Sequence, residues 1–458
     1  MPRDLIATDR QRPAKDRQAS GRALRKNIPR GVHAAWTRPT DRADPVTALV
    51  ENLRQDISHL LPIRYDRMSA SPATFLRGAA SIMAADLAHT PASGLWVQAC
   101  GDCHLHNFGT FATPEGTPIF DINDFDETLP APFEWDLKRL ATSFVLEAKT
   151  RGLSARIGRQ LARTAVLAYR VHMRSLIQVP PLELWRARVN LMEVIDAIED
   201  PKLRERETRR VATGIEASVV GYPHLFEKRR GCWRIIPKPP LIFPLTGQGD
   251  DTFEIVARSA FATYRRSLSE ERRLLLERYD LADVAFKVVG VGSVGTFCAI
   301  GLFVSSDGAP LLLQIKEART SVLAPYARPS EYPNQGKRVV IGQRIMQAQS
   351  DLFLGWTEQS GDDQHCYVRQ LKDSRLARMA DELAETSLSH HATLCGLTLA
   401  RAHARSGDPA AMAGYMGSGG AFDAAIAAFA VAYAEQTQED WKLLRAAIKS
   451  GQIDARPG

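Results

Sequence analysis

The chain has few cysteines and no long apolar run. Its 458 residues include six cysteines, which are too few and too scattered for the disulfide framework of a small secreted domain. No segment approaches the run of about 18 apolar residues that a membrane span needs. The N-terminus is rich in arginine from residue 3 and lacks the apolar core of a signal peptide. We therefore expect a cytoplasmic protein with reduced thiols and no membrane partner.

Positive charge gathers at the N-terminus. Residues 1–40 hold ten Lys/Arg and three Asp, a net of +7, which equals the formal net charge of the whole chain. Trp36 is the one aromatic residue of this segment, so it lacks the interleaved aromatic side chains of a nucleic-acid surface. We interpret residues 1–45 as a basic arm, solvated or partly docked, and do not expect nucleic acid as a partner. Binding to a polyanion is the alternative.

The most informative motif is Cys-Gly-Asp-Cys-His-Leu-His-Asn-Phe-Gly at residues 100–109. It sets Asp102 five residues before Asn107, and the acidic run Asn-Asp-Phe-Asp-Glu follows at residues 123–127. Phosphoryl transfer needs one carboxylate to orient the acceptor hydroxyl, and an amide oxygen with a further carboxylate to hold Mg²⁺ on the phosphates. Asp102 and Asn107 are therefore candidate catalytic residues, and Asn107 and Asp124 are candidate metal ligands.

Three further residues near this motif are candidates for supporting roles. Asp121 is the alternative metal ligand to Asp124, but it lies three residues earlier and on the opposite face of the same expected strand. Asp136 stands at the start of an expected helix and could brace the loop that carries Asp102. We expect His104 to pack and hydrogen-bond around Asp102.

A glycine-rich loop follows much later in the chain. Residues 286–295 read as a strand that runs into Gly290-x-Gly292-x-x-Gly295. Such loops let backbone N–H groups approach phosphates closely, so Gly290, Gly292 and Gly295 are candidates to cradle the phosphates of ATP. The same pattern occurs in dinucleotide-binding folds, where a helix follows it, and in kinases, where a second strand and then a Lys follow.

The residues after the loop favour the kinase arrangement. Residues 296–304 are rich in β-branched and aromatic side chains, and Asp307-Gly308 is a hairpin signal. The next strand ends in Lys316, which we expect to pair with the α- and β-phosphates of ATP. A dinucleotide-binding fold would instead need a helix at residues 296–304.

The sequence leaves the carboxylate partner of Lys316 open. The next expected helix, residues 337–350, contains no Glu, so Glu317 and Glu331 are the alternatives. A second open point is a set of arginines that could clamp an anionic substrate, with surface ion pairs as the alternative. These arginines are Arg64, Arg67 and Arg77.

The cysteines and histidines of the motif permit two other interpretations. Cys100-x-x-Cys103-His104 matches the pattern for covalent haem attachment, which generally needs an exported chain. The same three residues with His106 could bind zinc, but no second Cys/His pair of matching spacing occurs. We expect packing and hydrogen bonding for these histidines.

The acidic motifs together resemble a known superfamily. Gly101-Asp-x-x-x-x-Asn107, Asp124-Phe-Asp and Asp136-Leu-x-x-Leu-Ala are similar to the catalytic core of the aminoglycoside and choline phosphotransferases, which are protein-kinase-like. This resemblance implies ATP and Mg²⁺ as cofactors. The chain from residue 21 to residue 408 also resembles an uncharacterised bacterial family, domain of unknown function 2252, whose name implies no activity.

The order of the motifs predicts an α+β, two-lobed protein-kinase-like fold that is circularly permuted, with the catalytic lobe before the nucleotide lobe. The four prolines within residues 235–245 exclude a helix interior and mark a boundary. If the lobes face each other, Lys316 must lie within roughly 10 Å of Asp124, a span that ATP and Mg²⁺ bridge. The expected parts are a basic arm (1–45), a helical catalytic lobe (46–234), a Pro-rich linker (235–250), a β-rich nucleotide lobe (251–372) and a helical segment that returns to the catalytic lobe (373–458).

Local patterns predict the main elements within these parts. A hairpin is expected over residues 109–121, with its turn at Pro114-Glu-Gly116. A strand is expected at residues 94–99. Helices are expected at residues 133–152, 155–178, 182–198, 202–218 and about 251–278.

Taken together, these features predict an ATP- and Mg²⁺-dependent phosphotransferase that acts on a hydroxyl-bearing acceptor, either a small molecule or a protein. Two alternatives remain open. One is a nucleotide-binding regulator without transfer activity, a pseudokinase. The other is an NAD(P)-dependent oxidoreductase built on the glycine loop, which a helix at residues 296–304 would favour.

Overall fold

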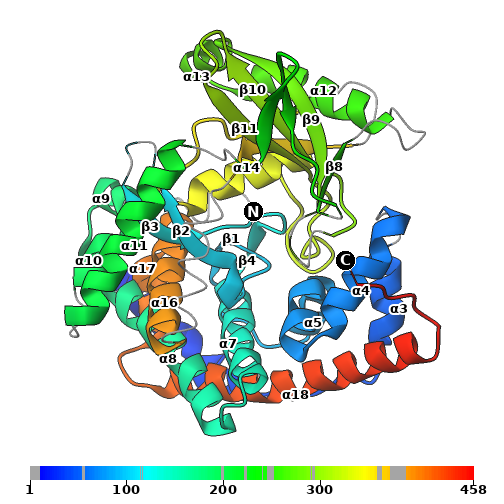
Figure 1. The fold of residues 1–458 in the computed structure, drawn as a ribbon. Coiled ribbons are helices and arrows are strands. Elements are labelled where there is room, and N and C mark those ends of the chain that lie inside the picture. Colours follow the sequence, from blue (N-terminus) through cyan, green and yellow to red (C-terminus); the bar gives the residue numbers. More distant parts are fainter. Residues whose placement is uncertain are drawn as a thin grey trace.

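A computed structural model gives a mixed α+β fold in which a group of helices lies below a six-stranded sheet (Figure 1). This confirms the predicted α+β class. We call residues 11–196 and 388–457 the helical body, and the described part of residues 224–371 the sheet body. The structure describes residues 11–53, 57–113, 115, 117–196, 201–220, 224–239, 241–244, 252–288, 290, 294–357, 364–371 and 388–457.

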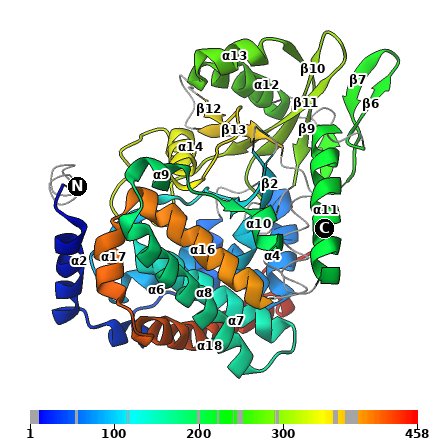
Figure 2. The ribbon, with the colours of Figure 1, turned by 90° about the vertical axis from the view of Figure 1, so that its left-hand side faces the viewer.

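Long helices form the centre of the helical body. Along α8, apolar side chains recur at helical spacing, so that Leu161 and Tyr169 are buried, and the Ser154 hydroxyl caps the helix. α7 is buried along almost its whole length, because α8 covers one side and α18 another. The C-terminal helices thus pack on α7 and α8, as expected of a returning segment (Figure 2). These helices are α7 (Phe133–Thr150), α8 (Ala155–Ser175), α16 (Leu388–Ser406), α17 (Pro409–Met416) and α18 (Ala421–Lys449).

The described part of the basic arm is docked on the helical body. Helix α2 (Ala14–Ala23) lies against α17 (Figure 2), so closely that a side chain at Gly21 would collide with the backbone of Ala411. Arg25 and Arg30 donate to the last carbonyls of α17, which favour positive charge. Two 3₁₀ turns follow α2, namely η1 (Leu24–Lys26) and η2 (Arg30–Ala34).

Four short helices complete the helical body on its other side. Ser71 and Thr74 form a capping box, with Pro72 in the first turn of the helix. Apolar side chains of these helices pack against the end of α18. The helices are α3 (Pro45–Asn52), α4 (Leu61–Ser69), α5 (Pro72–Gly78) and α6 (Ala80–Ala88), with the turn η3 (Ser58–Leu60) before α4.

Two small sheets lie between α7 and the sheet body. The predicted hairpin is confirmed: β2 and β3 pair antiparallel with Gly109 opposite Asp121, while Pro114 and Gly116 of the turn lie outside the described residues. The predicted strand before the motif is β1, which pairs with β4. The strands are β1 (Trp96–Ala99), β2 (Phe108–Ala112), β3 (Pro118–Ile122), β4 (Leu129–Pro132) and β5 (Val189–Asn190), the last beside β3.

The sheet body is built on an antiparallel sheet with the order β12-β13-β11-β10-β9-β8. Residues 298–305 form a strand in its middle, so the helix that a dinucleotide-binding fold would need is not formed there. Cys298 lies opposite Lys316. The strands are β8 (Ile242–Pro244), β9 (Tyr279–Lys287), β10 (Cys298–Ser305), β11 (Pro310–Glu317), β12 (Gly355–Trp356) and β13 (Cys366–Gln370).

Both faces of this sheet are covered, which corrects two sequence boundaries. The hairpin of β6 (Phe226–Arg229) and β7 (Cys232–Ile235) packs on β9 and β10, although the sequence assigned it to the catalytic lobe. The expected linker contributes β8 as an edge strand, a position that tolerates proline. On the other face lie α12 (Thr252–Tyr264), η6 (Arg265–Ser267) and α13 (Glu270–Leu276), where the sequence predicted one continuous helix.

The remaining helices connect or flank the two bodies. The expected helix at residues 182–198 is interrupted by strand β5. Among the described residues, no single helix is long and apolar enough to cross a membrane, and the pair α17 and α18, which passes together, is bent by 80°. The helices are η5 (Leu176–Gln178), α9 (Pro181–Arg186), α10 (Leu191–Asp196), α11 (Pro201–Val220) and α14 (Gln335–Met346), of which α14 touches α16, β12 and β13.

Candidate active site between the two bodies

Asp136 holds the backbone of the Gly-Asp loop. Its carboxylate accepts hydrogen bonds from the N–H groups of Cys100, at 2.6 Å, and Gly101, at 3.0 Å. The same carboxylate lies 3.0 Å from Nε2 of the buried His403 on α16. The loop that the sequence expected Asp136 to brace is therefore fixed at its start by a buried, charge-assisted network.

The Gly-Asp loop also touches the acidic run directly. Gly101 has a φ of +84°, and a Cβ at this position would lie 2.5 Å from the carbonyl oxygen of Glu127. Only glycine satisfies both the backbone conformation and the close approach. The loop and the acidic run thus form one unit.

Asp102 projects into the cleft between the bodies but is engaged by an arginine. Its side chain is 24% exposed, and it accepts a hydrogen bond of 2.8 Å from Nε of the buried Arg139. Nε2 of His104 lies 3.6 Å away from the second carboxylate oxygen. Burial raises the pKa of Asp102, and the charge of Arg139 opposes this rise. Burial also lowers the pKa of His104 well below its usual range, so this histidine is neutral at pH 7.

Asn107 joins the two acidic segments. Its Nδ2 donates to the carbonyl oxygens of Asp102, at 3.0 Å, and Asp124, at 3.2 Å. Because these bonds use the amide nitrogen, the amide oxygen is the atom suited to bind a cation. An amide oxygen with a nearby carboxylate is a hard donor set that fits Mg²⁺, which commonly takes one or two protein ligands besides phosphates.

Lys316 reaches the acidic run from the sheet body. Its Nζ lies 3.4 Å from Asp124 and 2.6 Å from Asp126, well within the separation of roughly 10 Å expected for a shared ATP site. The Tyr367 hydroxyl donates to the other oxygen of Asp126 at 2.6 Å. Burial lowers the pKa of Lys316, but the two carboxylates outweigh this effect and hold the pKa well above its usual range. Burial and the charge of Asp124 raise the pKa of Asp126.

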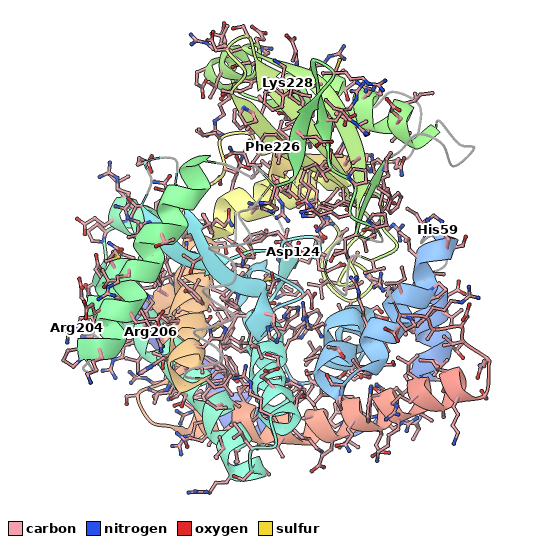
Figure 3. The ribbon with its side chains drawn as sticks, viewed as in Figure 1. His59, Asp124, Arg204, Arg206, Phe226 and Lys228 are labelled. Atoms are coloured by element: carbon pink, nitrogen blue, oxygen red, sulfur yellow. The ribbon has the colours of Figure 1, made fainter. Side chains whose placement is uncertain are left out.

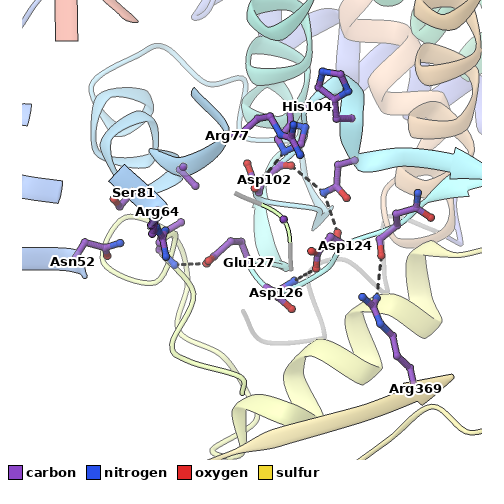
Figure 4. Close-up of a pocket in the computed structure, with 17 residues that line it drawn as sticks. Asn52, Arg64, Arg77, Ser81, Asp102, His104, Asp124, Asp126, Glu127 and Arg369 are labelled. Carbon is purple, nitrogen blue, oxygen red and sulfur yellow. Dashed lines mark hydrogen bonds and ion pairs between the residues drawn. The ribbon is translucent and has the colours of Figure 1, made fainter. Parts of the chain in front are cut away.

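Asp102, Asn107, Asp124 and Asp126 line one cavity of about 230 Å³, whereas Lys316, which is 2% exposed, is not among its lining residues. The cavity lies near Asp124, which Figure 3 labels between the helices and the six-stranded sheet. In Figure 4, Arg77 lies beside Asp102, and Arg64 lies beside Glu127. Besides Arg64 and Arg77, the lining groups include Asn52, Ser81, His104, His106, Asn107, Asn123, Asp126, Glu127, Gly290 and Arg369.

The glycine loop reaches this cavity with its first glycine. Gly290 lines the cavity, and its carbonyl oxygen accepts a hydrogen bond of 2.6 Å from Arg67. The carbonyl of Gly295, at the other end, accepts from the Ile57 N–H at 2.7 Å. Gly292 lies outside the described residues. Of the three predicted phosphate-cradling glycines, the structure therefore brings Gly290 to the cavity.

Asp121 does not take part in the cavity, which corrects its role as an alternative metal ligand. It is completely buried, pairs with the buried Arg401 and accepts a hydrogen bond from the Ala348 N–H. Asp121 anchors β3 to α14 and α16 because strand alternation turns it away from the cavity. Lys316 likewise has its partners in the acidic run: Glu317 instead pairs with Arg319.

Sequence reasoning missed three residues of the site. Asp126 and Glu127 belong to the quoted acidic run, and that run was the signal that could have found them. Burial raises the pKa of Glu127 to about 7, and this side chain points toward Arg64 (Figure 4). Arg369 on β13 donates to the Asn123 carbonyl at 3.1 Å, and no local pattern marks it.

The structure does not support the cysteine-based metal sites. Cys100 and Cys103 are buried, and burial raises the pKa of Cys103 well above its usual range, which disfavours the thiolate. Within the described ranges, no cluster of three or more His, Cys, Asp or Glu side chains is arranged to hold a metal ion.

The fold and the cleft define an α+β protein with a mixed-charge site formed between a helical body and an antiparallel sheet. The chain belongs to a family described as an uncharacterised protein conserved in bacteria, domain of unknown function 2252, whose sequence pattern matches residues 54–447. This confirms the family resemblance found in the sequence. No curated protein and no solved structure matches the chain.

Proposed function

We propose that this protein is an ATP- and Mg²⁺-dependent phosphotransferase with a protein-kinase-like, circularly permuted fold. The observation that carries the proposal is the contact of Lys316 with Asp124, which are separated by 192 residues and come from different bodies. A strand lysine beside a metal-binding carboxylate, with an Asp and an Asn next to it, is the set of groups that phosphoryl transfer requires. The cleft holds the acceptor hydroxyl close to Asp102 in this proposal.

Each residue has a separate task. Asp102 orients the acceptor hydroxyl and takes its proton, and the burial that raises its pKa makes it a stronger base. Lys316 neutralises the phosphates and the backbone at Gly290 binds them. Gly290 and Arg369 line the cavity, and Lys316 contacts Asp124 beside it. Asn107 and Asp124 would hold Mg²⁺, which supplies charge neutralisation at the phosphate oxygens.

The order of strands supports the permuted arrangement. Strands β9, β10 and β11 run antiparallel, with the glycine loop between the first two and Lys316 on the third, and α14 follows before β12 and β13. This is the strand, loop, strand, lysine, helix order of a kinase nucleotide lobe. The segment with Asp102 and Asn107 precedes it in the chain and faces it in space.

A thermal-shift experiment tests the nucleotide site. The wild-type protein and the Asp124→Ala variant are compared with ATP, ADP and NAD(P), each with and without Mg²⁺. A ligand at 100 times its Kd stabilises the folded state by about 2.7 kcal/mol. We expect a shift with ATP that depends on Mg²⁺ and is lost in the variant.

A matched variant separates the site from a general effect of lost charge. Asp307→Asn removes an exposed carboxylate from the turn between β10 and β11, far from the acidic run in the chain. We expect it to retain the full shift with Mg²⁺ and ATP. An Asp124→Ala variant that responds like the wild type contradicts the proposed metal site.

A second candidate is a nucleotide-binding regulator without transfer activity. Two observations favour it: Asp102 is paired with the buried Arg139, and α14 carries no acidic residue to partner Lys316. Binding of Mg²⁺ and ATP without ATP turnover, over a broad panel of hydroxyl acceptors, would support this candidate. We do not propose an oxidoreductase, because residues 298–305 form a strand where dinucleotide binding needs a helix.

A further inference from the structure

A second cavity lies at another junction of the two bodies, and it is strongly basic. Its volume is about 330 Å³, and three arginines from three different helices converge on it. Arg272 comes from α13, Arg344 from α14 and Arg405 from α16. Glu115 is the one acidic residue among the described residues that line it, so the lining carries an excess of about two positive charges.

The guanidinium of Arg405 is held in place at this cavity. It stacks over the ring of Trp185, with 3.8 Å between Cζ and the ring centroid, and it donates to the carbonyl of Gln347. Its Nε is buried and has no hydrogen-bond acceptor among the described residues.

Among the described residues, Arg344 and Arg405 form no ion pair with a carboxylate, whereas Arg272 lies near Glu271. Burial and the charge of Arg401 lower the pKa of Arg405 to about 10. Burial and the charge of Arg272 lower the pKa of Arg344. Asp121 faces Arg401, with which it pairs, and Arg272 lies 3.8 Å from the exposed Glu271. An anion in the cavity would offset the repulsion that remains.

We propose that this cavity, formed by Trp185, Arg272, Arg344 and Arg405, is a binding site for a small phosphate-bearing ligand. Guanidinium groups match the oxygens of phosphate in geometry, and a dianionic phosphate matches the excess of two positive charges. This site is separate from the candidate active site and does not depend on the proposed function.

The position of the site suggests what an occupant would do. It joins α13 and α14 of the sheet body to α9 and α16 of the helical body. Gln347, whose carbonyl accepts from Arg405, donates through Nε2 to the Ile122 carbonyl at 2.8 Å, next to the acidic run. A bound phosphate therefore stabilises the arrangement in which the two bodies face each other.

Isothermal titration calorimetry of the full chain with inorganic phosphate, at constant ionic strength, tests the site. We expect Arg272→Gln to weaken phosphate binding by about tenfold, because one charge-assisted contact is lost. Arg272 is chosen for substitution because its side chain is 27% exposed, so its replacement should disturb the fold little. Glu115→Gln is expected to tighten binding two- to threefold, roughly, because it removes the one lining negative charge.

Two matched variants identify where phosphate binds. Arg77→Gln removes a positive charge from the candidate active site, and Arg258→Gln removes one from the exposed surface of α12. Arg258→Gln is expected to bind phosphate as the wild type does, and Arg77→Gln is expected to lose less affinity than Arg272→Gln. The proposal is overturned if the wild type does not bind phosphate, if Arg272→Gln retains wild-type affinity, or if Arg77→Gln shows the larger loss. Thermal unfolding of Arg272→Gln with Mg²⁺ and ATP should match the wild type, which separates this result from the proposed function.

Discussion

The helical body and the sheet body hold their sides of the cleft in different ways. On the helical side, Asp136 fixes the Gly-Asp loop and Asn107 ties that loop to the acidic run through buried hydrogen bonds. On the sheet side, the described ends of the glycine loop are held through backbone carbonyls, one of them by Arg67. The loop that carries Asp102 is thus held by a buried side-chain network, whereas the described ends of the glycine loop are held through their backbone carbonyls.

The largest expected effect is on folding stability and comes from breaking the ion pair of Arg401 with Asp121, which lies next to the acidic run in the chain. Arg401→Met leaves the buried carboxylate of Asp121 without its ion pair, which should cost about 3–5 kcal/mol of folding stability. Denaturant unfolding measures this loss. The exposed ion pair of Arg258 with Glu254 is the control, since Arg258→Met should cost at most about 1 kcal/mol. If both variants lose the same amount of folding stability, the buried Asp121–Arg401 pair contributes no more than an exposed ion pair.

The next largest effect concerns the proposed catalytic role of Asp102. Asp102→Asn keeps the size of the side chain but removes the proton acceptor, so ATP turnover should fall by about 10²–10⁴-fold. The thermal shift with Mg²⁺ and ATP should remain, because Asp102 acts on the acceptor and not on the nucleotide. Unchanged turnover rules out the proposed role, and loss of nucleotide binding would move Asp102 to the nucleotide site.

Glu127 provides a prediction about pH. Its folded-state pKa of about 7 lies above the ordinary value of 4.5, so the folded protein binds more protons between these values. The contribution of this carboxyl group to stability is therefore present below pH 4.5 and is lost as pH rises through about 7. Glu127→Gln should be more stable than the wild type at pH 8, by at most about 3 kcal/mol, and equally stable at pH 4.

Urea unfolding of both proteins across this pH range measures the effect of Glu127→Gln. Glu227→Gln, which removes an exposed carboxylate from β6, is the control for a general change in charge. A Glu127→Gln variant that follows the wild-type pH curve would show that this carboxyl is already ionised in the folded protein.

The smallest expected effect comes from loosening the glycine loop at Gly290. Arg67→Gln removes the hydrogen bond to the Gly290 carbonyl from a partly exposed side chain, so stability should fall by about 1 kcal/mol or less. We expect a several-fold weaker affinity for ATP with little change in kcat, because a looser loop binds phosphates less well. A large loss of stability would mean that the loop is anchored as firmly as the catalytic side.

Local patterns predicted the elements better than they predicted their contacts. The β2–β3 hairpin, the capped start of α5 at Ser71 and the strand at residues 298–305 all follow from neighbouring residues. The assignment of the β6–β7 hairpin failed, because its partner strands β9 and β10 lie about fifty or more residues later.

The candidate site shows the same division. Asp102, Asn107 and Asp124, which line the cavity, were chosen from the sequence because phosphoryl transfer needs these residue types at this spacing. Arg369 was not found, since a single arginine on a strand has no local signature. The burial of Asp121 against Arg401 also depends on α16, which comes 280 residues later.

The sequence by itself determined the elements, the family and the candidate chemical groups, because periodicity, caps and motif spacing act between near neighbours. The tertiary structure alone decided that Lys316 pairs with Asp126 as well as Asp124, that Asp102 is held by Arg139, and that a basic cavity forms where α13, α14 and α16 meet. Burial and charge at these places depend on segments that only folding brings together.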